Sequence, residues 1–377
     1  MRIFLLGCIA FLAYVYVGYP LICSLLAGVS RRRIRTGPIT PKVSILIAAY
    51  NEAIHISATV RNKLELDYPA DHIEIIVISD GSDDGTDEVV AEIAASEDRV
   101  KLIRQEPRAG KTSALNAGAA LAGGNIFVFS DANSLYAPDA LRKLLEPFGD
   151  PDVGYVTGQM LYKSPDGSLT GKVCSIYMRY ENALRVLESA IGSVVGVAGG
   201  IDAIRAELYT AMRPDQQPDF VLPLSVVERG WRVVYVPGAR LFETSLAETS
   251  SEFRMRSRVT LRAWHALRDK AGLLNPFRYG LYSWQLFSHK WLRYLAHVFQ
   301  VGALVSNAAL LGHGPMWDGL FVLQAIFYLV AALGFLGRSL PAPLSFPYYL
   351  CLLNAAAGWA LVRFLLGHKQ VTWTPRT

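Results

Sequence analysis

Residues 42–80 read KVSILIAAYNEAIHISATVRNKLELDYPADHIEIIVISD. The segment contains two apolar runs rich in Val and Ile, at 43–49 and 73–78, with a pattern of helical spacing between them at 53–66. Short, continuous apolar runs are typical of strands buried on both faces of a parallel sheet. The order strand, helix, strand therefore predicts a βαβ unit.

The same alternation continues along the chain. Further apolar runs lie at 100–103 and 125–129, helical patterns at 87–95 and 112–121 alternate with them, and another helix is expected after Pro138. This order predicts an α/β domain with a mostly parallel, Rossmann-like sheet. Such sheets bind ligands outside the carboxyl ends of their strands, so the residues after each strand are the first site candidates.

Long apolar segments without charged side chains flank this domain, at 3–27, 294–311, 319–337 and 344–362. Each is near the about 20 residues that a helix needs to cross a membrane. Of the 377 residues, 52% are hydrophobic and 18% charged, which excludes a disordered chain. Three of the four cysteines lie in apolar segments, so no disulfide framework or cysteine metal cluster is indicated.

Basic residues predict the orientation. Arg31, Arg32, Arg33 and Arg35 follow the first apolar segment, whereas only Arg2 and the amino terminus precede it. By the positive-inside rule the α/β domain faces the cytoplasm, in a multi-pass protein of the inner (plasma) membrane. A cleaved signal peptide is the alternative, but the run is long for one and no small-x-small site precedes the arginines. The net charge of +5 is thus explained without nucleic-acid binding.

We therefore expect five parts along the chain. They are a transmembrane helix at 1–30, the α/β domain at 40–250, amphipathic interfacial helices at 251–290, three transmembrane helices at 291–366 and a tail at 367–377. Four spans place the basic tail outside, against the positive-inside rule, so either a re-entrant last span or a different number of spans stays open. Polar residues inside the spans either line a sugar path or, as we favour, hydrogen-bond between helices; they are Gln300, Asn307, Gln324 and Asn354.

Acidic side chains follow two of the predicted strands. The second strand runs into Asp80, and the fourth into Asp131-Ala-Asn133. Turn chemistry is the alternative explanation for each cluster, because Asp, Asn, Ser and Gly also favour turns and N-caps. Both clusters lie at the expected binding edge, however. Asp131 and Asn133 offer the hard oxygen ligands that Mg²⁺ or Mn²⁺ uses together with substrate phosphates, so we predict a divalent-metal site there.

Several motifs in order resemble the membrane-bound family 2 glycosyltransferases, which include cellulose, chitin, hyaluronan and poly-N-acetylglucosamine synthases. The matching segments are AYNE at 49–52, DGS at 80–82, GK at 110–111, ALNAG at 114–118, FSDAN at 129–133, GGI at 199–201, AIR at 203–205, PDF at 218–220 and GWRVVY at 230–235. The resemblance spans about 42–264. It implies a GT-A fold and inverting transfer from a nucleotide-diphosphate sugar, with a UDP-sugar as the favoured donor.

The resemblance also implies roles for the matching residues. Positions that hold the base and ribose of the donor are matched by Tyr50, Asn51, Glu52 and Asp80. The pyrophosphate would meet the metal on Asp131 and the side chain of Lys111, which begins a predicted helix whose free N–H groups favour anions. A solvated lysine at a helix start is the alternative for Lys111.

A catalytic base is the next requirement, because an acceptor hydroxyl must lose its proton as it attacks the anomeric carbon. Asp219 matches the aspartate that serves as this base in the family. An ordinary helix N-cap is the alternative explanation for Asp219, and Asp202 and Asp215 are the nearby alternative bases.

Arg254, Arg258 and Arg262 are spaced by four and predict an amphipathic helix with a row of arginines. The row lies either against lipid headgroups or against the donor pyrophosphate. In the family a Gln-x-x-Arg-Trp motif on this helix contacts the pyrophosphate, and its tryptophan lines the acceptor site. We assign Arg258 and Arg262 to the pyrophosphate and Trp264 to the acceptor. This chain lacks the glutamine and separates Arg262 from Trp264 by one residue, which weakens the case for a processive polymerase.

The expected protein is a membrane hexosyl- or N-acetylhexosaminyltransferase that depends on Mg²⁺ or Mn²⁺ and elongates a polysaccharide. The first alternative is transfer of one sugar to a lipid or lipid-linked acceptor. A remote alternative is a non-catalytic membrane subunit, against which Asp80, Asp131 and Asp219 argue. Expected partners are the nucleotide-sugar, the polysaccharide or lipid-linked acceptor and membrane lipids, without nucleic acid; a partner membrane subunit is left open.

Overall fold

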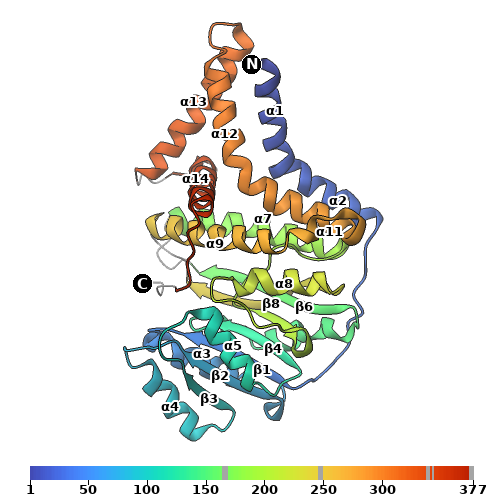
Figure 1. Cartoon of the computed structure of the whole chain (residues 1–377), viewed down its shortest axis with the longest axis vertical. Coiled ribbons are helices and arrows are strands. Elements are labelled where there is room, and N and C mark those ends of the chain that lie inside the picture. Colours follow the sequence, from blue (N-terminus) through green and yellow to red (C-terminus); the bar gives the residue numbers. More distant parts are fainter. Residues whose placement is uncertain (164–168, 245–248, 337–339, 342–343, 373–377) are drawn as a thin grey trace.

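The computed structural model describes residues 1–163, 169–244, 249–336, 340–341 and 344–372. Its centre is an eight-stranded sheet in the order β3-β2-β1-β4-β7-β6-β8-β5 (Figure 1). The first four strands are parallel to one another; they are β1 (Val43–Ala49), β2 (Ile73–Ser79), β3 (Val100–Arg104) and β4 (Ile126–Asp131). The connecting helices are α3 (Ala53–Leu64), α4 (Thr86–Ser96) and α5 (Lys111–Leu121). These elements confirm the predicted α/β fold.

Alternating side chains of β1 explain why this half of the sheet forms. Ile45 and Ile47 face one apolar core with α3 and α4, and Leu46 and Ala48 face a second core with α5. Every residue of β1 is buried. A strand covered on both faces is nearly continuously apolar, and the one polar residue of β1, Ser44, has its hydroxyl hydrogen-bonded to Glu74 and to the backbone N–H of Gly124.

The other half of the sheet lies outside the predicted strands. β7 (Asp202–Arg205) runs antiparallel between β4 and β6 (Val153–Lys163), while β8 (Arg232–Thr244) is parallel to β6 and the short β5 (Leu135–Tyr136) forms the edge. The helices associated with it are α6 (Ala140–Leu145), α7 (Leu169–Ile191) and α8 (Pro218–Glu228).

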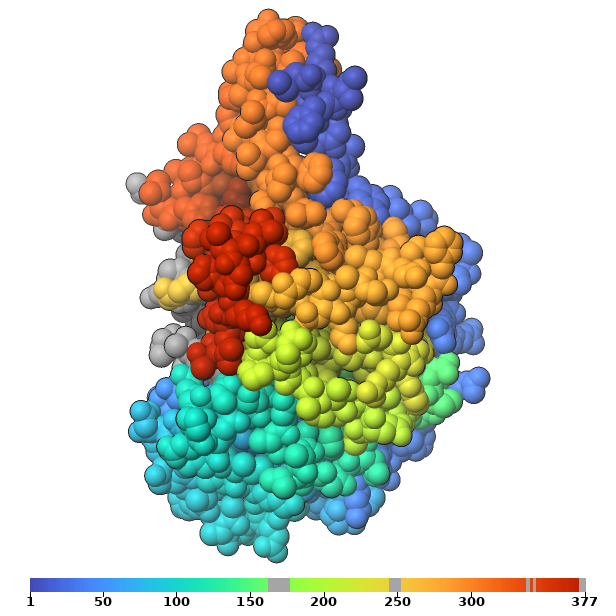
Figure 2. All heavy atoms as spheres, in the orientation of Figure 1, coloured from blue at the N-terminus to red at the C-terminus, as the bar shows by residue number. Residues whose placement is uncertain are grey.

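A layer of helices separates the sheet from a group of projecting helices. Figure 1 shows α7, α9 (Thr249–Asp269) and α11 (Leu281–Leu286) between the sheet and three projecting helices, α1 (Arg2–Ala13), α12 (Arg293–Ala308) and α13 (Pro315–Phe335). In the space-filling view, α1 and α12 rise as a narrow column from a broad, rounded base (Figure 2). α14 (Ser345–Leu365) packs on α9, α12 and α13. Figure 1 shows α14 nearly along its axis but the projecting helices from the side, so α14 runs in a different direction from them.

Three helices of the described residues are long and apolar enough to cross a membrane, at Arg2–Val29, Pro315–Phe335 and Ser345–Leu365. The first joins α1 to α2 (Tyr19–Val29) through a π-helical turn. The remaining predicted span, 294–311, falls mostly in α12, which continues from α11 through a π-helical turn at Phe287–Leu292. This helix is not among the three candidates. By length and composition, one span thus precedes the sheet and two follow it.

The predicted tail lies partly outside the described residues. Its described part returns from α14 to the α/β domain, where Lys369 Nζ lies 2.9 Å from Asp215 Oδ2. The backbone carbonyl of His368 lies 2.9 Å from Nε2 of His265 on α9. These contacts attach the chain after α14 to the sheet domain.

Candidate active site

A cavity of about 170 Å³ lies at the carboxyl ends of β1 and β4, the edge at which ligands of parallel sheets bind. Its walls bring together seven of the predicted site residues, namely Glu52, Lys111, Asp131, Asn133, Asp219, Arg258 and Arg262. They come from β4, from the starts of α5 and α8, from α9 and from loops. We call this the donor cavity.

Lys111 and Asp131 form an ion pair on one wall of the donor cavity. Lys111 is the first residue of α5 and follows Gly110, whose φ of +92° favours glycine. Burial opposes the charge of Lys111, but the carboxylates of Asp131 and Asp219 outweigh it, so the pKa of Lys111 is raised. Lys111, the predicted phosphate contact, is therefore positively charged at the start of α5.

Asp131 and Asn133 were predicted to hold the metal. In the described part of the chain, no three His, Cys, Asp or Glu side chains are placed to hold a metal by themselves. A carboxylate and an amide oxygen at one cavity wall nevertheless fit Mg²⁺ or Mn²⁺, which commonly take their other ligands from substrate phosphates and water.

Asp219 is the second residue of α8 and lies close to a glycine loop. Gln217, rather than Asp219, occupies the N-cap position, and its Nε2 donates to Asp219 Oδ2 at 3.1 Å. A Cβ on Gly199 would lie 3.0 Å from the same oxygen, and Gly199 has a φ of +74°. The glycine thus lets the backbone approach this carboxylate.

The two alternative bases are placed differently. Asp215 pairs with Arg213 at 3.1 Å and with Lys369, and neither it nor Asp202 lines the donor cavity. Asp202 is buried on β7, and burial raises its pKa to about 7; a hydrogen bond from Thr157 opposes this shift and the charge of Asp219 adds to it. Asp219 is the candidate that faces the cavity.

Asp80 is fully buried at the end of β2. Its carboxylate accepts hydrogen bonds from the backbone N–H groups of Ala109 at 2.8 Å and Gly110 at 3.0 Å, and from Nε2 of Gln105 at 2.6 Å. Arg108 Nε also donates to it at 3.3 Å. Asp80 therefore fixes the loop before α5 and does not line the donor cavity; its predicted donor contact stays a prediction.

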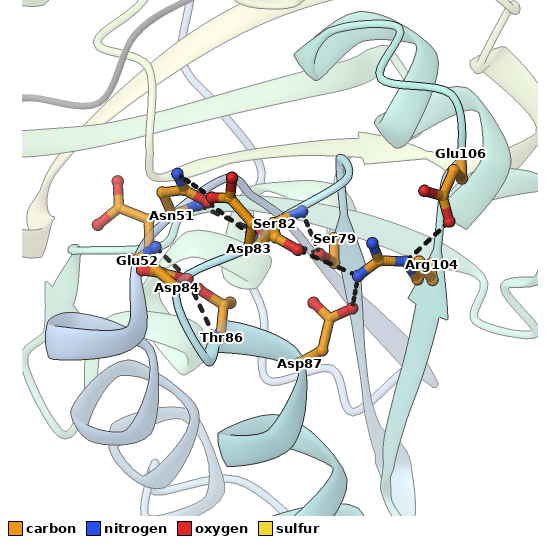
Figure 3. A network of polar contacts seen from close by, with 10 residues as sticks. All are labelled: Asn51, Glu52, Ser79, Ser82, Asp83, Asp84, Thr86, Asp87, Arg104 and Glu106. Atoms are coloured by element: carbon orange, nitrogen blue, oxygen red, sulfur yellow. Dashed lines mark hydrogen bonds and ion pairs between the residues drawn. The ribbon is translucent and has the colours of Figure 1, made fainter.

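Tyr50 belongs to the same corner of the site, because the guanidinium of Arg108 lies 3.3 Å from the centre of its ring. Asn51 has a φ of +54° and forms two hydrogen bonds with Asp83 (Figure 3). Its Nδ2 donates to Asp83 Oδ1 at 2.8 Å, and its Oδ1 accepts from the backbone N–H of Asp83 at 3.1 Å. Asp84 caps Thr86 through both its backbone N–H and its hydroxyl. Turn chemistry thus explains Asp83 and Asp84.

The Glu52 carboxylate points away from this network, as Figure 3 shows, and lines the donor cavity. Its backbone N–H is held by the hydroxyl of Thr86 at 2.9 Å. The loop is therefore rigidly bonded at its backbone and presents one carboxylate to the cavity.

Residues 44–210 match the family described as Glycosyl transferase family 2. These residues therefore form a family 2 glycosyltransferase domain. Curated relatives include the "Probable glycosyltransferase YdaM" of Bacillus subtilis (strain 168), 37% identical over 123 residues, 32% of this chain and 29% of the relative. They also include the beta-monoglucosyldiacylglycerol synthase of Trichormus variabilis, 38% identical over 118 residues, 31% of this chain and 25% of the relative.

The poly-beta-1,6-N-acetyl-D-glucosamine synthase of Staphylococcus epidermidis is 32% identical over 159 residues, 42% of this chain and 38% of the relative. The matches thus cover between 25% and 38% of the length of these three relatives. Among solved structures, the mannosyltransferase PcManGT from Pyrobaculum calidifontis, in complex with GDP-Man and Mn²⁺, has a TM-score of 0.77 at 21% identity, over 97% of this chain and 98% of that one. The family 2 domain therefore has the predicted GT-A fold.

The predicted arginine helix is α9, which follows the residues matched by the family. Arg258 lines the donor cavity, and so does Arg262, whose Nη2 donates to Thr112 Oγ1 at 3.0 Å and to the carbonyl oxygen of Gln216. Burial lowers the pKa of Arg262 to about 10. Arg254 is exposed and lines neither the donor cavity nor the larger cavity described below.

Trp264 is buried and does not line the donor cavity. Its ring stacks on Phe364 with centroids 5.8 Å apart and meets Trp291 edge-on at 5.3 Å. Two residues beyond Arg262 lie about 200° further round a helix of 3.6 residues per turn. The altered spacing therefore turns this tryptophan toward α14, and the placement does not support its predicted acceptor role.

A second cavity, of about 250 Å³, was missed by sequence reasoning. It shares Lys111, Asp131 and Asp219 with the donor cavity and continues to α12 and α14, so we call it the acceptor-side cavity. Charged side chains outside the predicted set line it, namely Glu181, Arg185, Arg256, Lys290 and Arg293. The usable signal was the spacing of Glu181, Arg185 and Glu188, which places three charges on one face of a helix.

Proposed function

We propose that this protein is an inverting glycosyltransferase that uses a nucleotide-diphosphate sugar, with a UDP-sugar as the first candidate. The acceptor would be bound at the cytoplasmic face of the membrane. The observation that carries the proposal is the position of Asp219, which lines both the donor cavity and the acceptor-side cavity. No Lys, Arg or His of the described residues is within ion-pair distance of Asp219, whereas Asp131 is paired with Lys111.

The residues then divide the reaction between them. The donor diphosphate lies at Lys111, Arg258 and Arg262, with its nucleoside toward the Tyr50–Glu52 loop. A divalent ion on Asp131 and Asn133 would neutralise charge on the diphosphate. Asp219 takes the proton of the acceptor hydroxyl as its oxygen bonds to the anomeric carbon. The bond from that carbon to the diphosphate breaks, and the nucleoside diphosphate leaves.

Two acceptors fit this scheme. A growing polysaccharide is the first, in keeping with the poly-beta-1,6-N-acetyl-D-glucosamine synthase among the relatives. Transfer of one sugar to a lipid or lipid-linked acceptor is the second, because the acceptor-side cavity reaches Tyr16 and Asn354 in two candidate membrane spans. Product length separates the two.

The test is nucleotide release by the detergent-purified protein with a panel of UDP- and GDP-sugars, membrane lipids and oligosaccharides. Asp219→Asn should lower release by about 10²–10⁴-fold and leave nucleotide binding intact, because it removes only the base. Asp215→Asn is the matched control, since Asp215 lies nearby but outside both cavities. Chelation should abolish release, and Mn²⁺ or Mg²⁺ should restore it. Undiminished release by Asp219→Asn would refute the assignment of the base.

A further inference from the structure

The acceptor-side cavity holds more positive charge than the donor requires. Arg293 is paired with Glu181 at 2.6 Å, and Arg256 with Glu252 at 2.8 Å. Lys290, by contrast, forms no ion pair or hydrogen bond with any residue that the structure describes. The cavity therefore contains a lysine without a carboxylate partner.

Arg185 is the second such cation. The residue is 5% exposed, and its guanidinium is held by neutral groups: the carbonyl oxygen of Gly196 at 2.7 Å, that of Val197 at 3.2 Å and Oδ1 of Asn182 at 2.6 Å. No ion pair of Arg185 occurs within the described ranges. Buried charges are normally paired, so two neighbouring cations with no carboxylate of the described residues within ion-pair distance favour an anion from outside the chain.

The two cations meet at one point of the backbone. A Cβ on Gly196 would lie 2.8 Å from Lys290 Nζ, and the carbonyl oxygen of the same glycine accepts from Arg185. Three residues further on, a Cβ on Gly199 would lie 3.0 Å from Asp219. The same short segment therefore carries the cations at one end and the proposed base at the other.

The donor diphosphate does not account for these cations. Arg258 and Arg262 line the donor cavity only, whereas Arg185 and Lys290 line the acceptor-side cavity only. Burial also lowers the pKa of Lys290 to about 8, with the charge of Glu181 opposing this shift, so a bound anion would stabilise the charged form. The anion therefore belongs to the acceptor.

A third cavity, of about 220 Å³, adjoins the acceptor-side cavity between the projecting helices. Tyr16 and Asn354 line both cavities and are hydrogen-bonded to each other at 3.0 Å. The remaining walls are mostly apolar, with Leu12, Ala303, Phe327 and Leu350 among them. Glycan hydroxyls would lose their water here without enough partners, whereas a hydrocarbon chain would not.

The polar residues near the third cavity already have partners. Asn307 Nδ2 donates to Gln324 Oε1 at 3.0 Å, and Gln300 Nε2 donates to Cys351 Sγ at 3.6 Å. They join α12 to α13 and α14, which is the expected hydrogen bonding between helices. These contacts argue against a sugar path through the helices.

We infer that Arg185 and Lys290 bind the phosphate of a lipid-linked acceptor, whose hydrocarbon chain lies in the third cavity while a hydroxyl of its head group reaches Asp219. This inference rests on the proposed function and names its acceptor class. The phosphate is bound and not cleaved, because the new bond joins the head-group oxygen to the anomeric carbon.

The test is binding of three probes to the full chain in detergent, read by native mass spectrometry or calorimetry. The probes are a long-chain polyprenyl phosphate, the matching polyprenol, and glycerol phosphate as a soluble source of the same anion. We expect polyprenyl phosphate to bind at least about tenfold more tightly than either of the others, since hydrogen bonds to charged groups are among the strongest in proteins. If polyprenyl phosphate and polyprenol bind with equal affinity, the inference is overturned. If glycerol phosphate binds as tightly as polyprenyl phosphate, the assignment of a hydrocarbon chain to the third cavity is overturned.

Variants locate the site. Lys290→Gln should weaken polyprenyl phosphate about tenfold and leave polyprenol and UDP binding unchanged. Arg278→Gln, on the exposed helix α10 (Pro276–Tyr279), is the matched control. Arg185→Gln should act in the same way, but Lys290→Gln decides the matter because Lys290 supports no backbone group. Unchanged binding by Lys290→Gln would overturn the inference. Binding needs no turnover, so its outcome is independent of nucleotide release, which tests the proposed function.

Discussion

The donor cavity and the acceptor-side cavity share Asp219 but are built in different ways. Around the donor cavity, loops that follow parallel strands are fixed mainly by hydrogen bonds to backbone groups, as at Asp80 and Asp84. Around the acceptor-side cavity, charged side chains from α7, α9 and α12 are buried against one another. The first arrangement depends on local chain geometry, whereas the second depends on helices that meet only in the folded protein.

The largest expected effect tests this dependence on buried charge. Glu181→Gln leaves Arg293 buried without its carboxylate partner, 2.6 Å away in the native protein. We expect a loss of about 3–5 kcal/mol in the free energy of unfolding, the usual result of breaking a buried pair. Denaturant unfolding measures it.

An exposed ion pair in the first half of the chain gives the control. Asp67 and Arg142 lie 2.9 Å apart with side chains that are 62% and 43% exposed. Asp67→Asn should therefore change stability by at most about 1 kcal/mol. Equal losses for Glu181→Gln and Asp67→Asn would remove the contrast between the two regions.

The pH dependence of stability gives the next effect. Folding raises the pKa of Asp202 to about 7, so the folded protein holds a proton that the unfolded chain releases near pH 4. The stability associated with this proton is fully present below about pH 4 and is lost as the pH rises through about 7. Asp202→Asn should therefore be more stable than the native protein at pH 8, by about 1–4 kcal/mol, and similar to it at pH 4.

Asp215→Asn is the opposite case. Burial opposes the shift, but hydrogen bonds from Lys369 and Arg213 lower the pKa of Asp215. Its carboxylate therefore stabilises the fold above its unfolded pKa, and the variant should lose stability at pH 8. Unfolding curves of both variants between pH 4 and 8 measure the two changes in stability. A gain in both variants at pH 8, or a loss in both, would contradict this account.

The parallel half of the fold was predictable because its signals are local. The run at 43–49 is apolar at every position except Ser44 and forms β1 with the same bounds. The edge rule for parallel sheets predicts Asp131 at the binding edge, and the family resemblance adds Lys111; the structure has both in one cavity. Lys290 and Arg185 could not be paired in this way, because 105 positions separate them and only the packing of two helices brings them to Gly196.

Substitution of Trp264 gives the smallest expected effect on activity. It tests whether this residue contacts the acceptor. Family resemblance predicts it at the acceptor, whereas its ring packs against Phe364, Trp291 and Tyr294 and lines neither the donor cavity nor the acceptor-side cavity. Trp264→Phe keeps an aromatic ring in this packing, so we expect a loss of about 1–3 kcal/mol in stability for the smaller ring. The KM for acceptor should stay within about twofold, since no contact with substrate is removed. A tenfold rise in that KM with an unchanged KM for donor would place the tryptophan at the acceptor after all, and would mean that α9 turns when the acceptor binds.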